Sequence, residues 1–316
     1  MRVQLVASVT IPLIRKETGI TLVDGSVDLA AVRGEVLRTR QKYLINAKRG
    51  GRDSTKRFLK SRKRSGIPLK LVSPSVWTGA ISIGNPPQIF NMYFDSGSTD
   101  LTLPSISCLA KACGNRARYS PNASTTAVSK HQTLNSAFAD GSVSTGAWWT
   151  DTVSAGNLVI AKQSLLAATA ISTTVATINS DGMGLAFIGL SSTGTSSVPV
   201  SMYEQGSGNY VGLRLSSIAN TSSISLGDMS LSAVPGHLAW YNVAVPSDGV
   251  KTYWQVELST PLVNRKPSLV KRVTHIIDSG TTLIVAPIAG ATEFWANVPG
   301  SAQVDAGHWT FVRLST

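Results

Sequence analysis

The chain has 316 residues, of which 42% are hydrophobic and 27 are glycine, a composition typical of a globular protein long enough for two domains. Its formal net charge of +12 would suggest a nucleic-acid or membrane partner if the charge were spread evenly. However, residues 1–70 contain 17 basic and 5 acidic residues, whereas residues 71–316 contain 12 of each. The basic excess is therefore confined to one N-terminal segment.

That N-terminal segment has its own pattern. Apolar residues recur at near-helical spacing from Asp28 to Lys48 with basic residues between them, which predicts a basic amphipathic helix. Residues 49–64 are polar and basic, and this predicts an exposed linker ending in a site for a basic-specific processing protease, Arg62-Lys63-Arg64. A solvated charge run and an RNA-binding tail are alternatives, although no aromatic residues interleave with the charges. Residues 1–14 make only a weak secretory signal.

Membrane and metal signals are weak throughout. No stretch of 18 or more uninterrupted apolar residues occurs, so a transmembrane helix is not expected. Cys108 and Cys113 are the only cysteines, and a short-loop disulfide formed in an oxidising compartment is favoured over two free thiols. The four histidines form no metal-binding motif, and we expect neither a metal nor a cofactor.

From Val76 onward the chain consists of short β-type runs separated by Gly, Pro, Asn and Ser. The first run, 77–83, is followed by a turn at 84–87 and a second run, 89–94. Only 200–205 and 289–297 have helical periodicity. The pattern predicts a mainly β fold with two orthogonally packed, sheet-rich lobes. Further β-type runs include Ser142, Trp148–Trp149, Val153, Leu158–Ile160, Tyr210–Leu215, Ser223–Leu226 and Trp254–Leu258.

One motif occurs twice, 183 positions apart: the run 95–99, Asp-Ser-Gly-Ser-Thr, returns at 278–282 as Asp-Ser-Gly-Thr-Thr. Each copy follows apolar residues, which predicts a buried strand ending in a tight turn. Glycine permits close backbone approach in such a turn, and the hydroxyl residues can hydrogen-bond the carboxylate. A single copy would be compatible with a surface turn, but two copies in one register indicate two related lobes.

Two such turns facing each other would bring Asp95 and Asp278 together. Carboxylates that close share a proton, because like charges at short range cannot both ionise. One carboxylate could then activate a water molecule as a general base, while the other, protonated, polarises a peptide carbonyl. The repeat therefore predicts a hydrolytic pair of aspartates.

Together with other motifs, the repeat resembles the pepsin-like aspartic peptidases, in particular secreted fungal members. The resemblance extends from about Pro12 to the C-terminus, and aspartic peptidases are the standard example of a proton-sharing carboxyl pair. It implies a bilobal pepsin-like acid protease fold with the active-site cleft between the lobes, and an aspartic-type endopeptidase that acts on polypeptides at acidic pH. The motifs are 79–88 (Gly-Ala-Ile-Ser-Ile-Gly-Asn-Pro-Pro-Gln), 94–105, the Cys108/Cys113 loop, Asp140-Gly141-Ser142 with Gly146, Tyr253-Trp254-Gln255 and 277–283.

The resemblance also assigns roles by position. Asp95 and Asp278 match the catalytic pair. Ser96 and Ser279 match the residues whose hydroxyls brace the two turns, and Ser98 and Thr281 match those that hydrogen-bond the catalytic carboxylates. The hairpin 134–148 matches the flap that closes over substrate and excludes water. The implied substrate-binding residues are Gly97, Gly280, Phe138, Ala139, Asp140, Gly141 and Tyr253; for Tyr253, an ordinary core aromatic is the alternative.

By the same resemblance, residues 1–64 are a propeptide-like basic segment that inhibits the enzyme intramolecularly. Residues 65–236 are the N-terminal catalytic lobe and 237–316 part of the C-terminal one. Only 38 residues follow Asp278, so we expect the second lobe to be incomplete. We expect a monomeric, disulfide-bonded zymogen that is secreted or vacuolar, without a nucleic-acid partner or a membrane span.

Three departures from the family pattern accompany these expectations. The flap has Phe138-Ala139 where the family has Tyr-Gly, and Thr102 replaces the tryptophan that pairs with that tyrosine. Losing both partners leaves no buried polar group unpaired, but it predicts a less firmly positioned flap and slower turnover. The segment 181–187 is one apolar residue short of the strand that the family threads behind the catalytic turn, and a slipped strand would reverse its inward face. With the short second lobe, these departures support an alternative, a catalytically inactive homologue that at most binds peptides.

Overall fold

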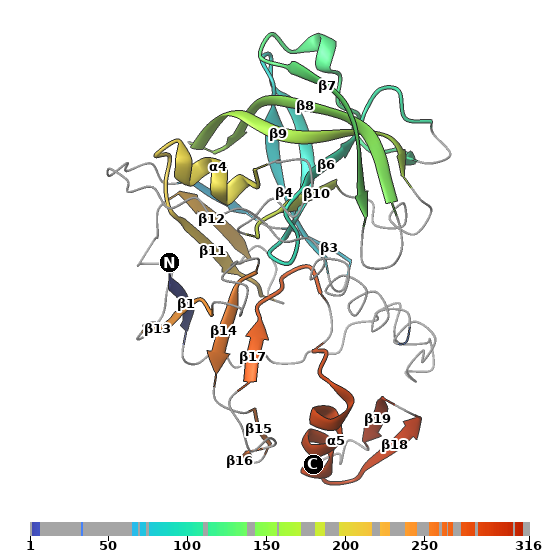
Figure 1. Ribbon diagram of the computed structural model, residues 1–316, viewed down its shortest axis with the longest axis vertical. Coiled ribbons are helices and arrows are strands. Elements are labelled where there is room, and N and C mark those ends of the chain that lie inside the picture. Colours follow the sequence, from blue (N-terminus) through green and yellow to red (C-terminus); the bar gives the residue numbers. More distant parts are fainter. Residues whose placement is uncertain are drawn as a thin grey trace.

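The computed structural model is built mainly from β-strands, with few helices among the residues it describes (Figure 1). The predicted helix 28–48 lies outside those residues apart from the helical Arg33, and so do the flap residues 138–142. The described residues are 2–6, 33, 65–68, 70–73, 76–109, 113–137, 143–156, 158–171, 181–186, 196–216, 222–227, 238–244, 253–258, 261–263, 265–267, 273–281, 284–305 and 307–311.

An eight-stranded sheet forms the body of the first lobe, in the order β3-β4-β5-β10-β6-β9-β8-β7 (Figure 1). In β5, alternate residues Phe90, Met92 and Phe94 are buried, because successive side chains of a strand point to opposite faces. This face packs into the main core and leads directly into Asp95. The strands are β3 (Lys70–Ser73), β4 (Val76–Ile83), β5 (Gln88–Asp95), β6 (Leu101–Pro104), β7 (Val128–Ala137), β8 (Val143–Ala155), β9 (Leu158–Ile171) and β10 (Asp181–Gly184).

Strand β10 lies between β5 and β6, behind the first aspartate turn. It runs parallel to β5, with Met183 opposite Phe94 and Gly184 opposite Asp95, and antiparallel to β6. Met183 and Leu185 are both buried. The segment that is one apolar residue short of the family pattern therefore still supplies two inward-facing apolar side chains at this position.

The remaining strands form small sheets. Those that follow residue 237 lie below the large sheet in the view of Figure 1. Val243 and Val256 form a second small core, against which Trp254 and Ile277 pack. One three-stranded sheet contains β11 (Tyr210–Arg214), β12 (Ser223–Gly227) and β2 (Ser65–Pro68). The pairs are β1 (Arg2–Val6) with β13 (Leu238–Asn242), β14 (Gln255–Leu258) with β17 (Val273–Ile276), β15 (Leu262–Val263) with β16 (Lys266–Pro267), and β18 (Ser301–Asp305) with β19 (His308–Phe311).

The two helices predicted from periodicity after Val76 are present. The helix predicted at 200–205 is α4 (Val198–Glu204), and the one predicted at 289–297 is α5 (Ile288–Ala296). Helix α4 has Pro199 in its first turn, where the missing amide hydrogen costs nothing, and it packs on the main core through Val198 and Met202. A short 3-10 helix, η1 (Pro121–Ala123), and the single helical positions at Arg33 and Cys113 complete the described helices. No described helix is long and apolar enough to cross a bilayer.

The disulfide prediction is confirmed, since Cys108 and Cys113 are bonded with their Cα atoms 6.1 Å apart. Both cysteines are buried and pack against Ala168 and Ile171 of β9. The bridge therefore pins the loop that follows β6 to the neighbouring strand of the large sheet.

The buried carboxylate of Asp151, which the sequence did not predict to have a structural role, links β8 to the segment 119–126. Asp151 is fully buried and accepts hydrogen bonds from the hydroxyls of Tyr119 (2.7 Å), Ser124 (3.1 Å) and Thr126, and from the Thr152 amide (2.7 Å). These donors offset the cost of burying a charge. Burial, and then the hydrogen bond to Asp151, raise the pKa of Tyr119 above its usual range, so the phenol stays protonated and remains a donor.

Candidate active site

The two copies of the repeated motif form matching turns. Asp95 is 5% exposed at the end of β5, and its Oδ1 accepts a hydrogen bond of 2.9 Å from the Gly97 amide. In the second copy, the Gly280 amide donates to Asp278 Oδ1 at 2.8 Å, and the Thr281 hydroxyl donates to Asp278 Oδ2. Each carboxylate is thus fixed by the backbone two residues further on, as in an Asx turn. Asp278 is half-buried and therefore more open to solvent than Asp95.

Four hydrogen bonds made by the hydroxyls of Ser96 and Ser279 hold the two turns together, and each hydroxyl bonds to backbone groups of the opposite turn. The Ser96 hydroxyl donates to the Ile277 carbonyl (2.8 Å) and accepts from the Ser279 amide (2.8 Å). In the mirror arrangement, the Ser279 hydroxyl donates to the Phe94 carbonyl (2.7 Å) and accepts from the Ser96 amide (3.0 Å). Because the two halves are reciprocal, the repeat in sequence becomes a local two-fold arrangement in space.

The second turn also presses against the first carboxylate. A Cβ atom added to Gly280 would lie 2.2 Å from Asp95 Oδ1 and 2.4 Å from its Cγ. Only glycine leaves room for this approach of backbone to side chain. The turn that carries Asp278 therefore lies directly beside Asp95, where two carboxylates would compete for a proton.

The two residues that follow β10 support this arrangement from behind. The Leu185 amide donates to the Asp95 carbonyl (2.8 Å), and the Ala186 amide donates to the Ser98 carbonyl (2.8 Å). From the second half of the chain, the Trp254 indole donates to the Leu185 carbonyl (2.9 Å). The backbone of the first turn is thus held by elements from both halves.

The structure places the other predicted site residues unevenly. The Ser98 amide faces the Asp95 carbonyl at 3.4 Å, beside the predicted catalytic aspartate. Tyr253 is 4% exposed and packs with Ala186 and Ile276, so its ring belongs to a buried cluster. The predicted flap residues 138–141 lie outside the described residues, and of the flap hairpin the structure gives the paired legs of β7 and β8. Thr102 is buried in β6, and its hydroxyl has no hydrogen-bond partner among the described residues. The expectation that losing both flap partners leaves no buried polar group unpaired is therefore wrong.

Two aspartate turns of one pattern, clamped face to face where two β-rich halves meet, define a site suited to acid–base hydrolysis. The chain belongs to the eukaryotic aspartyl protease family, which matches residues 76–312. It is 30% identical over 233 residues to an aspartic protease of Phaffia rhodozyma, covering 73% of this chain and 55% of that protein. It is also 30% identical to pepsin A of Bos taurus over 76% of this chain and 64% of the relative. For pepsin-2B of Gadus morhua the identity is 31%, over 74% and 72% respectively. The chain thus spans between about half and two thirds of the length of the first two relatives.

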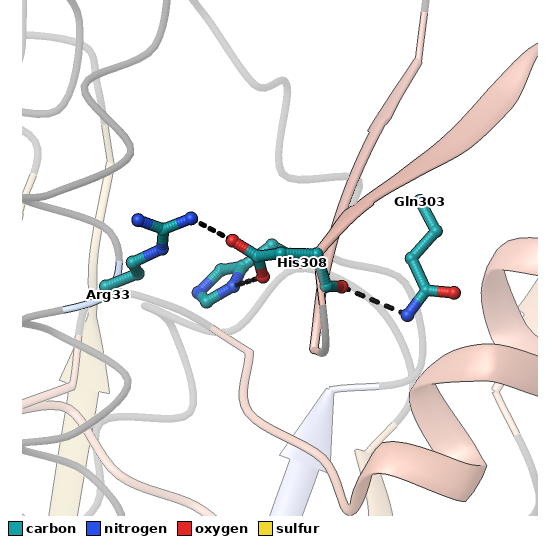
Figure 2. A network of polar contacts seen from close by, with 4 residues as sticks. Arg33, Gln303 and His308 are labelled. Carbon is teal, nitrogen blue, oxygen red and sulfur yellow. Dashed lines mark hydrogen bonds and ion pairs between the residues drawn. The ribbon is translucent and has the colours of Figure 1, made fainter.

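Two contacts among the described residues join the basic N-terminal segment to the second half of the chain. Strand β1 pairs antiparallel with β13, from Arg2 opposite Asn242 to Val6 opposite Leu238. Farther along, Arg33 reaches the hairpin β18–β19 and forms an ion pair with Asp305, which also hydrogen-bonds His308 (Figure 2). The Arg33 guanidinium, and then His308, lower the pKa of the Asp305 carboxyl.

The Arg33–Asp305 contact should weaken in acid. Because the folded-state pKa of Asp305 is lowered, the stabilisation is present above the unfolded value of about 3.9 and is lost as the pH falls through the folded value. Hydrogen exchange of β18–β19 between pH 6 and pH 3, corrected for intrinsic rates, should show this loss of protection. We expect Asp305→Asn to be poorly protected already at pH 6; a hairpin protected equally in both chains at both pH values would contradict the prediction.

Proposed function

We propose that this chain is an aspartic-type endopeptidase that hydrolyses peptide bonds at acidic pH through a water molecule activated by Asp95 and Asp278. The observation that carries the proposal is the approach of the Gly280 backbone to the Asp95 carboxylate, with the serine clamp that holds the two turns in place. Membership of the aspartyl protease family supports the same chemistry. No other arrangement among the described residues brings two paired carboxyl turns together across the two halves of the chain.

In the proposed reaction, the ionised carboxylate of the pair takes a proton from the water, whose oxygen attacks the peptide carbonyl carbon. The protonated carboxyl donates its hydrogen to the carbonyl oxygen, which gives a neutral tetrahedral intermediate. As the intermediate collapses, a proton passes to the amide nitrogen and the C–N bond breaks. The products are a carboxylic acid and an amine, and the pair again holds one proton. The Gly97 and Gly280 amides and the Thr281 hydroxyl keep the two carboxyl groups oriented throughout.

We also propose that residues 1–64 act as an intramolecular inhibitory segment, 65–236 as the first catalytic lobe and 237–316 as part of the second. The pairing of β1 with β13 and the contact of Arg33 with Asp305 support an attached segment, and the basic run 62–64 supports its later removal. A monomer that is secreted or stored in a vacuole agrees with the disulfide between Cys108 and Cys113.

An acid cleavage assay tests the proposal. The chain, processed after residue 64, is incubated with a denatured protein substrate from pH 2.5 to 7.5, and the products are identified by mass. Cleavage at internal peptide bonds should be fast at acidic pH and should fall toward neutrality as the shared proton is lost. Saturable binding of a peptide without turnover at any acidic pH would instead establish the inactive homologue.

A further inference from the structure

We infer that Asp100 and Ser136 are positioning residues that tie the flap hairpin to the catalytic loop, in place of the tyrosine–tryptophan pair that this chain lacks. The inference rests on the proposed function, because it concerns the same active site. It assigns to Asp100, within the motif 94–105, and to Ser136 of β7 the task of holding the end of β7 beside the loop that carries Asp95.

The contact joins two parts of the first lobe that are far apart in sequence. The Ser136 hydroxyl donates to Asp100 Oδ2 at 2.7 Å. Asp100 follows the first aspartate turn directly, and its carbonyl accepts a hydrogen bond of 3.0 Å from the Gly184 amide of β10. Ser136 lies near the end of β7, opposite Ser144 of β8, and is 7% exposed. One end of the contact is therefore fixed beside Asp95, and the other lies near the end of β7 that leads into the flap tip.

The pair stands close in sequence to the two replaced positions. Asp100 lies two residues before Thr102, and Ser136 lies two residues before Phe138. The hydrogen bond between them therefore links the same two segments of the chain that the tyrosine–tryptophan pair would link. The replaced positions cannot supply the contact themselves, since Phe138 has no polar side-chain atom and the Thr102 hydroxyl is buried without a hydrogen-bond partner in the described part of the chain.

The chemistry of the pair suits a tether. A hydrogen bond to a carboxylate is stronger than one between neutral groups, and a short serine side chain loses little rotational freedom when it is held. Without the tether, the hairpin would sample open positions more often, so fewer bound substrates would reach the closed arrangement. The effect should therefore appear in kcat more than in KM.

A set of five variants tests the tether. Asp100→Ala and Ser136→Ala should each lower kcat about tenfold with KM changed less than about twofold, and the double variant should also lose about tenfold rather than about a hundredfold. Asp100→Asn, which keeps an acceptor oxygen at the same place, should stay within about threefold of the unchanged chain. The matched control is Ser129→Ala, the same substitution in the same strand, whose hydroxyl accepts only the nearby His131 amide at 3.1 Å in the described contacts; its kcat should not change.

A second readout does not depend on turnover. Hydrogen exchange of the β7 peptide should speed up about tenfold or more in Asp100→Ala and Ser136→Ala but not in Ser129→Ala. If the exchange rates change as expected while no chain cleaves peptides, the proposed function fails and the tether stands. Independent, multiplicative losses of kcat in the double variant, or unchanged β7 exchange in both single variants, would overturn the tether.

Discussion

Replacing either Asp95 or Asp278 with asparagine is expected to lower kcat/KM for peptide cleavage by about 1,000-fold or more, because the amide can neither accept the proton of the attacking water nor share one with its partner. The amide retains an oxygen that can accept the hydrogen bonds from Gly97 or Gly280, so the fold should survive. The double variant should be no worse than either single one, since the two carboxyl groups act as a unit. The measurement is kcat/KM on a peptide substrate at the acidic optimum, with the melting temperature of each variant as a control.

The two single variants should fail equally, although Asp95 is buried and Asp278 is half-buried. A mechanism that needs a shared proton cannot run on one carboxyl group, whatever the exposure of the other. If Asp278→Asn cleaved a denatured substrate at more than about a tenth of the unchanged rate, Asp95 would be acting alone, and the proposed mechanism would be wrong.

Much of this fold could be predicted because its signals are local. The alternation in β5 and the helical spacing in α4 and α5 each depend on residues close in sequence. The repeated aspartate motif also carried its own evidence, since a second copy in the same register is hard to obtain by chance. The family resemblance then indicated the serine clamp at positions that the structure joins across 183 residues.

Other features could not be predicted because their partners are distant and their residue types are common. The Asp100–Ser136 hydrogen bond spans 36 positions, and neither residue interrupts a pattern that would attract notice. Asp151 did leave a signal in the sequence, because it is an acidic residue at an inward-facing position of a strand whose other inward-facing residues include apolar ones. Its hydroxyl donors, however, lie in the segment 119–126, where the sequence has no periodic pattern. In the segment 181–187, which contains β10, counting apolar residues suggested a slipped strand, whereas backbone pairing to both neighbours determines the observed register.

Adding a single methyl group at Gly280 is expected to lower kcat for cleavage by about 100-fold or more, because a displacement of the reacting groups by about 1 Å has effects of that size. The new Cβ would lie 2.2 Å from Asp95 Oδ1, so either the carboxylate or the second turn must move. Overpacking of this kind should also cost about 1–3 kcal/mol of stability, which leaves enough folded protein for the assay. Because Gly280 has no positive φ, the effect would come from crowding alone.

The matched control is Gly212→Ala in β11, where the nearest atom to an added Cβ is 3.6 Å away and φ is again not positive. Gly212→Ala should leave both kcat and KM unchanged.

Whether Gly280→Ala changes kcat or KM also distinguishes two possible roles of Gly280. If the glycine only makes room for substrate, Gly280→Ala should raise KM while kcat stays the same. If it sets the spacing of the two aspartate turns, kcat should fall with KM nearly constant, because the loss then lies in the reacting groups rather than in binding. A Gly280→Ala chain as active as Gly212→Ala would mean that the second turn does not rest against Asp95 in the working protein.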